Sequence, residues 1–241
     1  MTEITLEQLI NIINNNLDYV LELGILQEPQ LCRKPVHKFE RAFVHRESFC
    51  MIYSEADDPE IIYLSHNLNN NPAELIREHK ISRIISHANK ISGGELFESY
   101  YNSCDGSSYE NIRLLDSSDI NSAVPEDSSD YIKIIFDDFI INKIWHDCGI
   151  TGIFDNQDNF AGYLAYYKIT ENIRDISYIY IKSSFRGLGY AKKLLEYFKH
   201  INFQDNKISY YSYAADKASA NLAESCGFIP CAKRYEQNIL K

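Results

Sequence analysis

The stretch SSFRGLGYAKKLL, which runs from Ser183 to Leu195, decides most of what this sequence predicts. Its second half places apolar residues at helical spacing, so a helix is expected to begin just after the two glycines. The run RDISYIYIKSS before it is rich in β-branched and aromatic residues and predicts a strand. The stretch is therefore a strand end, a glycine turn and a helix start.

Such a turn suits an anion. A helix start leaves backbone N–H groups without intrahelical partners and carries the positive end of the helix dipole. Gly187 and Gly189 have no side chains, so phosphate oxygens can approach the backbone. Arg186, with Lys192 or Lys193, adds charge and favours a diphosphate over a single carboxylate. Taken alone, the stretch fits equally well a glycine turn that binds nothing.

Composition limits the classes of protein. The 241 residues include 34 acidic and 24 basic ones, a formal net charge of -10, which argues against a nucleic-acid-binding surface. Between Lys182 and Lys199, however, five basic residues stand against Glu196 alone. With no apolar run of membrane-spanning length and no signal-peptide pattern, we expect a cytoplasmic protein with no membrane partner. The six scattered cysteines predict neither a disulfide framework nor a zinc site, and we expect no metal.

The first part of the chain predicts a small α/β region of unknown role over residues 1–105. Apolar periodicity predicts one helix over residues 6–26, and residues 72–90 predict another. Residues 41–53 and 60–66 flank the turn-rich EADDP and predict the two strands of a hairpin. Periodicity is then lost among Gly, Ser, Asn and Asp, so a boundary is expected near residue 106.

Residues 106–241 predict a mixed α/β (α+β) domain, and no internal repeat is evident in the sequence. The pattern predicts a strand at 111–116, a helix at 130–146, a hairpin at 149–168 around DNQDN, a strand at 174–184, a helix at 186–201, a strand at 207–214, a helix at 218–227 and one or two closing strands.

Two motifs of this second region resemble signatures of one family. The R-x-x-G-x-A pattern that begins at Arg186 resembles the [QR]-x-x-G-x-[GA] signature of the GNAT (Gcn5-related) N-acetyltransferases, and it likewise follows a strand and opens a helix. DKASANLAESCGF, Asp216–Phe228, is similar to the family's second motif, with Asp216 where asparagine is usual and Ser219 at its serine. The resemblance covers about residues 111–241 and implies a GNAT-like mixed central sheet flanked by helices.

The resemblance implies acetyl-CoA as co-substrate and acetyl transfer to a primary amine of a small molecule or peptide. The backbone of the glycine turn would hold the pyrophosphate, and the strand before it would offer backbone groups to the pantetheine arm. The implied cofactor-binding residues are Tyr180, Ile181, Arg186, Gly187, Leu188, Gly189, Tyr190, Ala191, Lys192, Asp216 and Ser219.

Amine acetylation needs a base to take the amine's proton, and an acid can protonate the leaving thiolate. One branch of the family has a glutamate base eleven residues before the glycine motif, and Asp175 stands there. The family's usual acid is a tyrosine where this chain has Ala223, so the candidate acid is Ser219 or one of two strand tyrosines, Tyr211 and Tyr213, with Tyr213 preferred. The alternatives are an ordinary surface carboxylate at position 175 and tyrosines that only form the sheet.

Two rival functions stay open at this point. The departures at positions 216 and 223 fit a catalytically idle acyl-CoA-binding regulatory module, and residues 1–105 could bind a partner or complete the acceptor site. The acidic composition favours a cationic acceptor, such as a lysine side chain, a peptide amino terminus, a polyamine or an aminoglycoside. A homodimer is compatible with the sequence.

Overall fold

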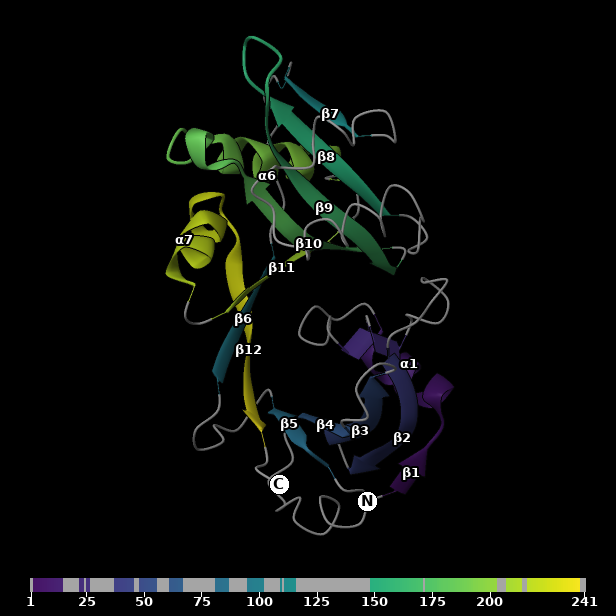
Figure 1. Cartoon of the computed structure of the whole chain (residues 1–241). Coiled ribbons are helices and arrows are strands. Elements are labelled where there is room, and N and C mark those ends of the chain that lie inside the picture. The colour runs from purple at the N-terminus through teal and green to yellow at the C-terminus, as the bar shows by residue number, and fades with distance from the viewer. Residues whose placement is uncertain are drawn as a thin grey trace.

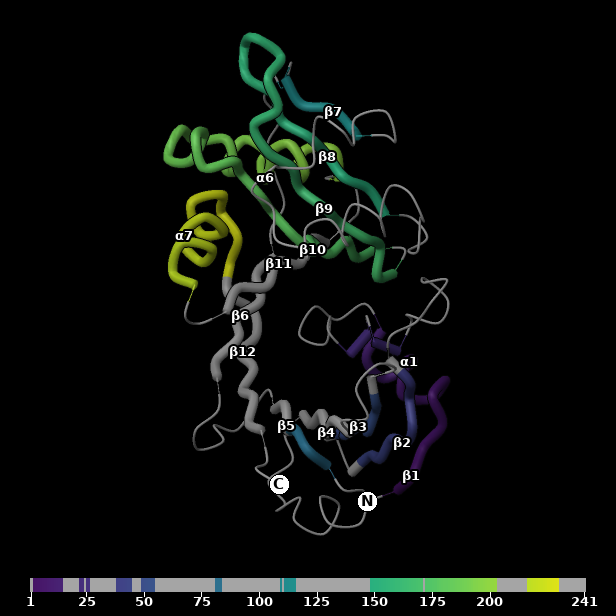
Figure 2. Tube along the Cα trace, in the orientation of Figure 1, coloured from purple at the N-terminus to yellow at the C-terminus, as the bar shows by residue number. Residues whose placement is uncertain are grey.

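The computed structural model describes residues 2–14, 22–23, 25–26, 37–45, 48–55, 61–66, 81–86, 95–101, 109, 111–115, 148–170, 172–202, 207–213 and 216–238, in part through the backbone alone (Figures 1 and 2). Their strands form one mixed sheet of twelve, in the order β1-β2-β3-β4-β5-β12-β6-β11-β10-β9-β8-β7. Neighbours are antiparallel except for the parallel pairs β4–β5 and β10–β11. The expected mixed sheet flanked by helices is confirmed.

The elements have the following bounds. The strands are β1 Thr2–Ile4, β2 His37–His45, β3 Ser48–Glu55, β4 Ile61–His66, β5 Arg83–Ser86, β6 Glu95–Tyr101, β7 Ile112–Leu114, β8 Cys148–Phe154, β9 Phe160–Thr170, β10 Ile173–Ile181, β11 Lys207–Tyr213 and β12 Ile229–Asn238. The helices are α1 Leu6–Ile13, α6 Tyr190–Ile201 and α7 Lys217–Ser225, with a 3₁₀ turn at Ser183–Phe185. Within these described ranges, no helix is both long and apolar enough to cross a membrane.

The sequence predictions hold for the second half of the chain wherever the structure describes it. The strand β7, the hairpin β8–β9, the strand β10, the helices α6 and α7 and the strands β11 and β12 lie where the pattern predicts them. The helix expected over residues 130–146 lies outside the described residues. Gly227, at φ 76°, follows α7 as the predicted helix stop.

Several predictions for the first half were wrong. The helix expected over residues 6–26 is interrupted: α1 ends at Ile13, because Asn14 is extended (φ -61°, ψ 138°) at the start of a run of asparagines, which are weak helix formers, and residues 22–23 and 25–26 are helical again. The stretch 41–53 is two paired strands rather than one. Ile84 and Ile85, expected on a helix, lie in β5, where β-branched side chains suit a sheet. The segment expected to be irregular contains β6.

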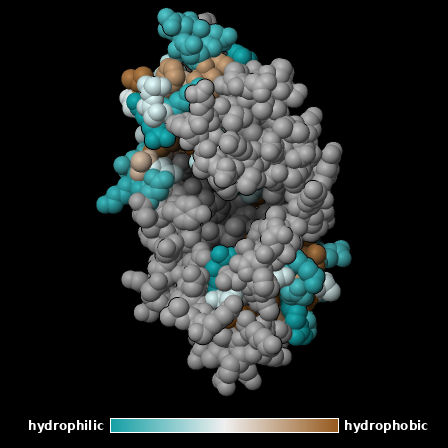
Figure 3. Space-filling model, in the orientation of Figure 1, coloured by the Kyte–Doolittle hydropathy of each residue, from teal (hydrophilic) through white to brown (hydrophobic). Residues whose placement is uncertain are grey.

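The β8–β9 turn shows a local cause for its shape. The Asp155 carboxylate accepts hydrogen bonds from the backbone N–H groups of Gln157 and Asn159, each at 2.8 Å, and from the Asn159 side-chain amide at 2.9 Å. These bonds, first that of the Asn159 side chain, lower the pKa of Asp155. The turn forms a hydrophilic tip at the top of the view in Figure 3.

Three buried clusters lie along the sheet. The N-terminal core comprises Leu9, Ile13, Leu23, Ile25, Leu26, Ala42, Phe49, Met51, Tyr53, Ile169 and Ile173. The helix-side cluster comprises Ile153, Ala161, Leu164, Ile176, Ile181, Leu194, Leu195, Phe198, Ala223, Cys226 and Phe228. The far-face cluster, on the other face of the sheet from α6, comprises Leu115, Ile150, Phe154, Phe160, Tyr163, Ala165 and Tyr180. Alternation along the strands thus buries both faces of β8–β10.

Candidate functional site

The parallel strands β10 and β11 separate partway along their length. Their ladder runs from Ile173 opposite Lys207 to Ile176 opposite Tyr210 and ends there, whereas β10 continues to Ile181. On its other side β10 stays paired with β9, but the register shifts between Ile176 and Tyr178. A bulge of this kind bends and twists the strand that carries it. The ladder toward β11 therefore stops where β10 bends away, and the last part of β10 presents backbone groups to the split.

The glycine turn follows directly at that end of β10. Gly187 and Gly189 have φ of 77° and 82°, a region open to glycine at no steric cost, and Gly189 is the N-cap of α6. A Cβ atom built at either glycine would meet nothing within 4 Å. Arg186 donates a hydrogen bond from Nε to the Ile181 carbonyl oxygen at 3.0 Å, which ties the turn to the strand end. The backbone of the turn is thus open and its position is held.

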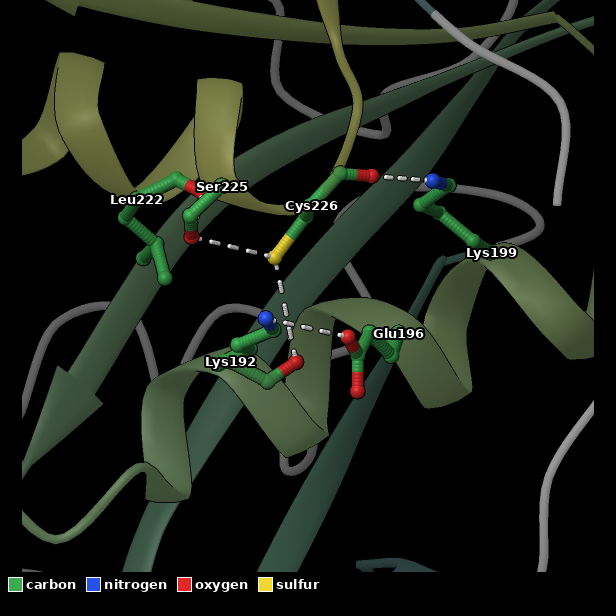
Figure 4. A network of polar contacts seen from close by, with 6 residues as sticks. All are labelled: Lys192, Glu196, Lys199, Leu222, Ser225 and Cys226. Atoms are coloured by element: carbon green, nitrogen blue, oxygen red, sulfur yellow. Dashed lines mark hydrogen bonds and ion pairs between the residues drawn. The ribbon is translucent and has the colours of Figure 1, made fainter.

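Of the lysines on α6, Lys192 and Lys193 lie beside the glycine turn, whereas Lys199 does not. Lys192 lies 3.8 Å from the Glu196 carboxylate, and Lys193 lies 5.9 Å from the Tyr190 ring, both at the start of α6. Lys199 is only 4% exposed and donates from Nζ to the Cys226 carbonyl oxygen (Figure 4). Its charge therefore serves the contact between α6 and α7 and not the turn.

Cys226 is the other half of that contact. Its Sγ lies 4.0 Å from the Lys192 carbonyl oxygen and 3.9 Å from the Ser225 hydroxyl (Figure 4). Burial raises the pKa of the Cys226 thiol above its ordinary value. The C-terminal end of α7 is thus fixed against α6 by one buried cation and one protonated thiol.

Asp216 and Ser219 are brought together, at the opposite end of α7. Asp216 is the N-cap, and its carboxylate accepts a hydrogen bond from the Ser219 backbone N–H at 3.0 Å. Aspartate is as good an N-cap as asparagine, so the departure from the family pattern at this position costs the helix little. With a rise of about 1.5 Å per residue, Asp216 stands roughly 15 Å and Ser219 roughly 10 Å along the helix from Cys226.

Asp175 is buried, with 6% of its surface exposed, and is not the surface carboxylate that the alternative interpretation supposed. It lies opposite Tyr167 on β9 and Ser209 on β11, one residue before the parallel ladder ends. Cross-strand partners share a face, and Tyr167 packs against both the N-terminal core and the far-face cluster. Asp175 therefore stands at the seam between these two clusters.

The other predicted residues occupy both sides of the split. Tyr180 and Ile181, 7% and 9% exposed, have side chains in the far-face and helix-side clusters, so only their backbone can face the split. Tyr213 ends β11 opposite Phe97 of β6, and the structure describes its backbone only. Leu188 is 64% exposed at the tip of the turn. The split and the turn are adjacent, whereas Asp216 and Ser219 belong to a different helix end.

Gly162 is a residue that the sequence interpretation missed. It lies opposite Ile181, and a Cβ atom there would stand 2.3 Å from the Tyr180 carbonyl oxygen. Only glycine therefore lets β9 approach the end of β10 this closely. A lone glycine within a strand pattern was the available signal.

Tyr166, opposite Ile176 at the bulge, is half-buried against the helix-side cluster. Burial raises the pKa of its phenol, so the hydroxyl stays protonated at neutral pH. Among the described side chains, no group of three or more His, Cys, Asp or Glu residues could hold a metal ion.

Comparison with known proteins gives the site a context. Residues 112–228 match the model of the acetyltransferase (GNAT) family. Similar solved structures include a GNAT-family acetyltransferase from Colwellia psychrerythraea, at 13% identity and a TM-score of 0.61, covering 100% of this chain and 99% of that one. A tandem GNAT protein from the clavulanic acid biosynthesis pathway matches at 10% identity and a TM-score of 0.55, covering 98% and 97%. A GCN5-related N-acetyltransferase-like protein from Streptococcus suis matches at 12% identity and a TM-score of 0.53, covering 97% and 98%. No curated protein sequence matches the chain.

Proposed function

Since residues 112–228 match the model of the acetyltransferase (GNAT) family, we propose that the chain is an acetyl-CoA-dependent N-acetyltransferase acting on a primary amine of a small molecule or peptide. The observation that carries this proposal is the adjacency of two features. The end of β10 beyond Ile176 presents backbone to a split, and the open glycine turn into α6 follows at the same end. One extended ligand with a diphosphate at one end and a thioester at the other suits both.

The glycine turn is the proposed pyrophosphate site. Backbone N–H groups at the start of α6 would bind the phosphate oxygens, supported by the helix dipole and by Lys192 and Lys193. The Arg186 Nε is engaged with Ile181, so this side chain would reach a phosphate only through its terminal nitrogens. The pantetheine arm would lie along the backbone of Tyr178–Ile181, on the side of β10 where its ladder with β11 has ended. The thioester would then lie at the closed end of the split, near Ile176, where the β10–β11 ladder ends.

Acetyl transfer at that position would proceed by attack of the neutral amine nitrogen on the thioester carbonyl carbon. A C–N bond forms, the C–S bond breaks, and the CoA sulfur leaves with the electron pair. Asp175 is the proposed base, which takes the ammonium proton directly or through a water molecule, because it is the carboxylate one residue from the end of the ladder. Tyr213 or Ser219 is the proposed donor of a proton to the sulfur. The use of acetyl-CoA is in keeping with a cytoplasmic location.

Titration calorimetry with acetyl-CoA tests the binding step. The full chain is expected to bind it with a Kd on the order of 1 μM to 1 mM, the usual range for enzyme substrates. ADP, which carries a diphosphate but no pantetheine arm, is the matched control and should bind more weakly. A folded sample with no heat of binding at millimolar acetyl-CoA overturns the proposal.

Transfer is tested separately, by mass spectrometry of a panel of amines incubated with the chain and acetyl-CoA. A mass increase of one acetyl group on at least one primary amine, above a control without protein, is expected. Binding without transfer to any member of a panel that includes lysine peptides, polyamines and aminoglycosides would instead indicate an acyl-CoA-binding module.

A further inference from the structure

The sheet contains the same topology twice. Strands β1 to β4 are successive antiparallel neighbours, and β5 joins β4 in parallel. Strands β7 to β10 are likewise successive antiparallel neighbours, and β11 joins β10 in parallel. One further strand follows each set, β6 after the first and β12 after the second. We call residues 2–101 the N-terminal copy and residues 111–238 the C-terminal copy.

The last strand of each copy is inserted into the other. β12 pairs with β5 of the N-terminal copy, and β6 pairs with β11 of the C-terminal copy. The two exchanged strands also pair with each other, in the middle of the sheet (Figure 1). The boundary expected near residue 106 lies between β6 and β7. β6 precedes this boundary in the sequence, yet it pairs with β11 and completes the sheet of the C-terminal copy. Neither copy is therefore complete without a strand from the other.

The two copies differ where the C-terminal copy has its candidate site. β4 and β5 are paired along the whole of β5, up to Ser65 opposite Ser86, so only His66 of β4 lies beyond the ladder. β10, by contrast, continues five residues past its last partner on β11. The connection between β4 and β5, residues 67–82, contains no glycine, whereas the connection between β10 and β11 contains Gly187 and Gly189. Over the residues that the structure describes, the N-terminal copy thus shows no split between β4 and β5, and its sequence has no glycine for a turn there.

The N-terminal copy contacts the C-terminal copy near Asp175. Its core includes Ile169 and Ile173, from the ends of β9 and β10, together with Leu9 and Ile13 of α1. In Figure 1, α1 lies between strands β2–β3 and the end of the β9–β10 hairpin. Asp175 is two residues from Ile173, and its cross-strand partner Tyr167 packs against the same core. The apolar core near Asp175 therefore includes a part from the other copy, Leu9 and Ile13 of α1, which we call the wall.

We propose that the N-terminal copy binds no acyl-CoA and instead forms the acceptor-side wall of the site in the C-terminal copy. The proposal rests on the function proposed above. The wall excludes water from the side of Asp175 that faces α1, and it limits the shape of the amine that can approach the base. Selection of the acceptor then depends on residues more than a hundred positions away in the sequence from the cofactor site.

The first test counts binding sites on the full chain by titration calorimetry with acetyl-CoA. One site per chain is expected, and Gly189→Val should weaken that site at least about tenfold. Two sites in the wild-type chain, or one site of unchanged affinity in Gly189→Val, would overturn the inference and leave the proposed function standing. No binding by a folded wild-type chain would overturn the proposed function itself.

The second test changes the wall and uses an amine that the transfer panel identifies. Ile13→Ala is expected to raise KM for the amine at least threefold and to leave the acetyl-CoA Kd unchanged. Ile52→Ala is the matched control, because Ile52 is equally buried in the N-terminal copy but is not part of the N-terminal core. Ile13→Val and Ile52→Val replace this pair if the alanine variants do not fold. Equal KM values within either pair would show that the wall does not select the acceptor.

Discussion

The glycine turn and the strand around Asp175 are the two ends of one candidate site, and they are built in opposite ways. The turn is exposed, comes from one short stretch of sequence, and would bind its ligand through backbone N–H groups. Asp175 is buried between two other strands, beside a core that includes residues of α1. A local sequence can make an anion site because a helix start needs only the right φ angles. A buried carboxylate needs surroundings that several distant segments must supply.

This contrast predicts that substitutions at the two ends affect different kinetic constants. Asp175→Asn is expected to have the largest effect, a loss in kcat of about 10² to 10⁴-fold, which is the usual contribution of a general base. The acetyl-CoA Kd should not change. Asp158→Asn, in the exposed β8–β9 turn, is the control and should keep wild-type kcat. A kcat for Asp175→Asn near that of the control would exclude Asp175 as the base.

Gly189→Val tests the other end. The valine would be strained at φ 82° and its side chain would cover the phosphate approach, so acetyl-CoA should bind at least about tenfold more weakly, or 1.4 kcal/mol. Because nothing lies within 4 Å of the added Cβ, the fold should lose only about 1–2 kcal/mol, measurable by urea unfolding. Leu114→Ala, at an exposed leucine of β7, is the control and should bind acetyl-CoA as the wild type does. An unchanged acetyl-CoA affinity in Gly189→Val would show that the phosphate site lies elsewhere.

Lys199→Met should have a smaller effect, confined to the cofactor end. It leaves the Cys226 carbonyl oxygen buried without its donor, at a cost of about 1–3 kcal/mol in the free energy of unfolding. Lys193→Met, exposed on the same helix, is the control and should unfold at the wild-type urea concentration. Weaker acetyl-CoA binding with an unchanged KM for the amine would show that the α6–α7 contact supports only the turn. A change in both constants would show that the two ends are coupled.

The smallest expected effect concerns Cys226. Burial raises the pKa of its thiol, so less thiolate is present at a given pH than for an exposed cysteine. Alkylation of the native chain at pH 8 should therefore modify the half-buried Cys148 before Cys226, with the order read by peptide mass spectrometry. Denaturation should remove the difference. Faster modification of Cys226 would mean that the α6–α7 contact opens readily in solution.

The sequence predicted the second half of the chain well because its signals are local. Glycines at the turn, an aspartate-rich hairpin and apolar periodicity in α6 each act within a few residues. The first half was predicted poorly because strand-pairing partners, distant in the sequence, decide which of its segments become strands. Ile84 and Ile85 suit a helix or a strand, and their parallel neighbour β4 makes them a strand. β6 has little pattern of its own and becomes a strand by insertion between β11 and β12.

By itself the sequence determined the glycine turn, the strand and helix on either side of it, and the resemblance to a family of acetyltransferases, because these depend on residues that are neighbours in the chain. Only the tertiary structure decided that β10 and β11 part at Ile176, that Asp175 is buried, and that each half contributes a strand to the other. These features depend on which distant strands pair and how far their ladders run. The free energy of pairing and burial is shared among segments that no short window of sequence contains.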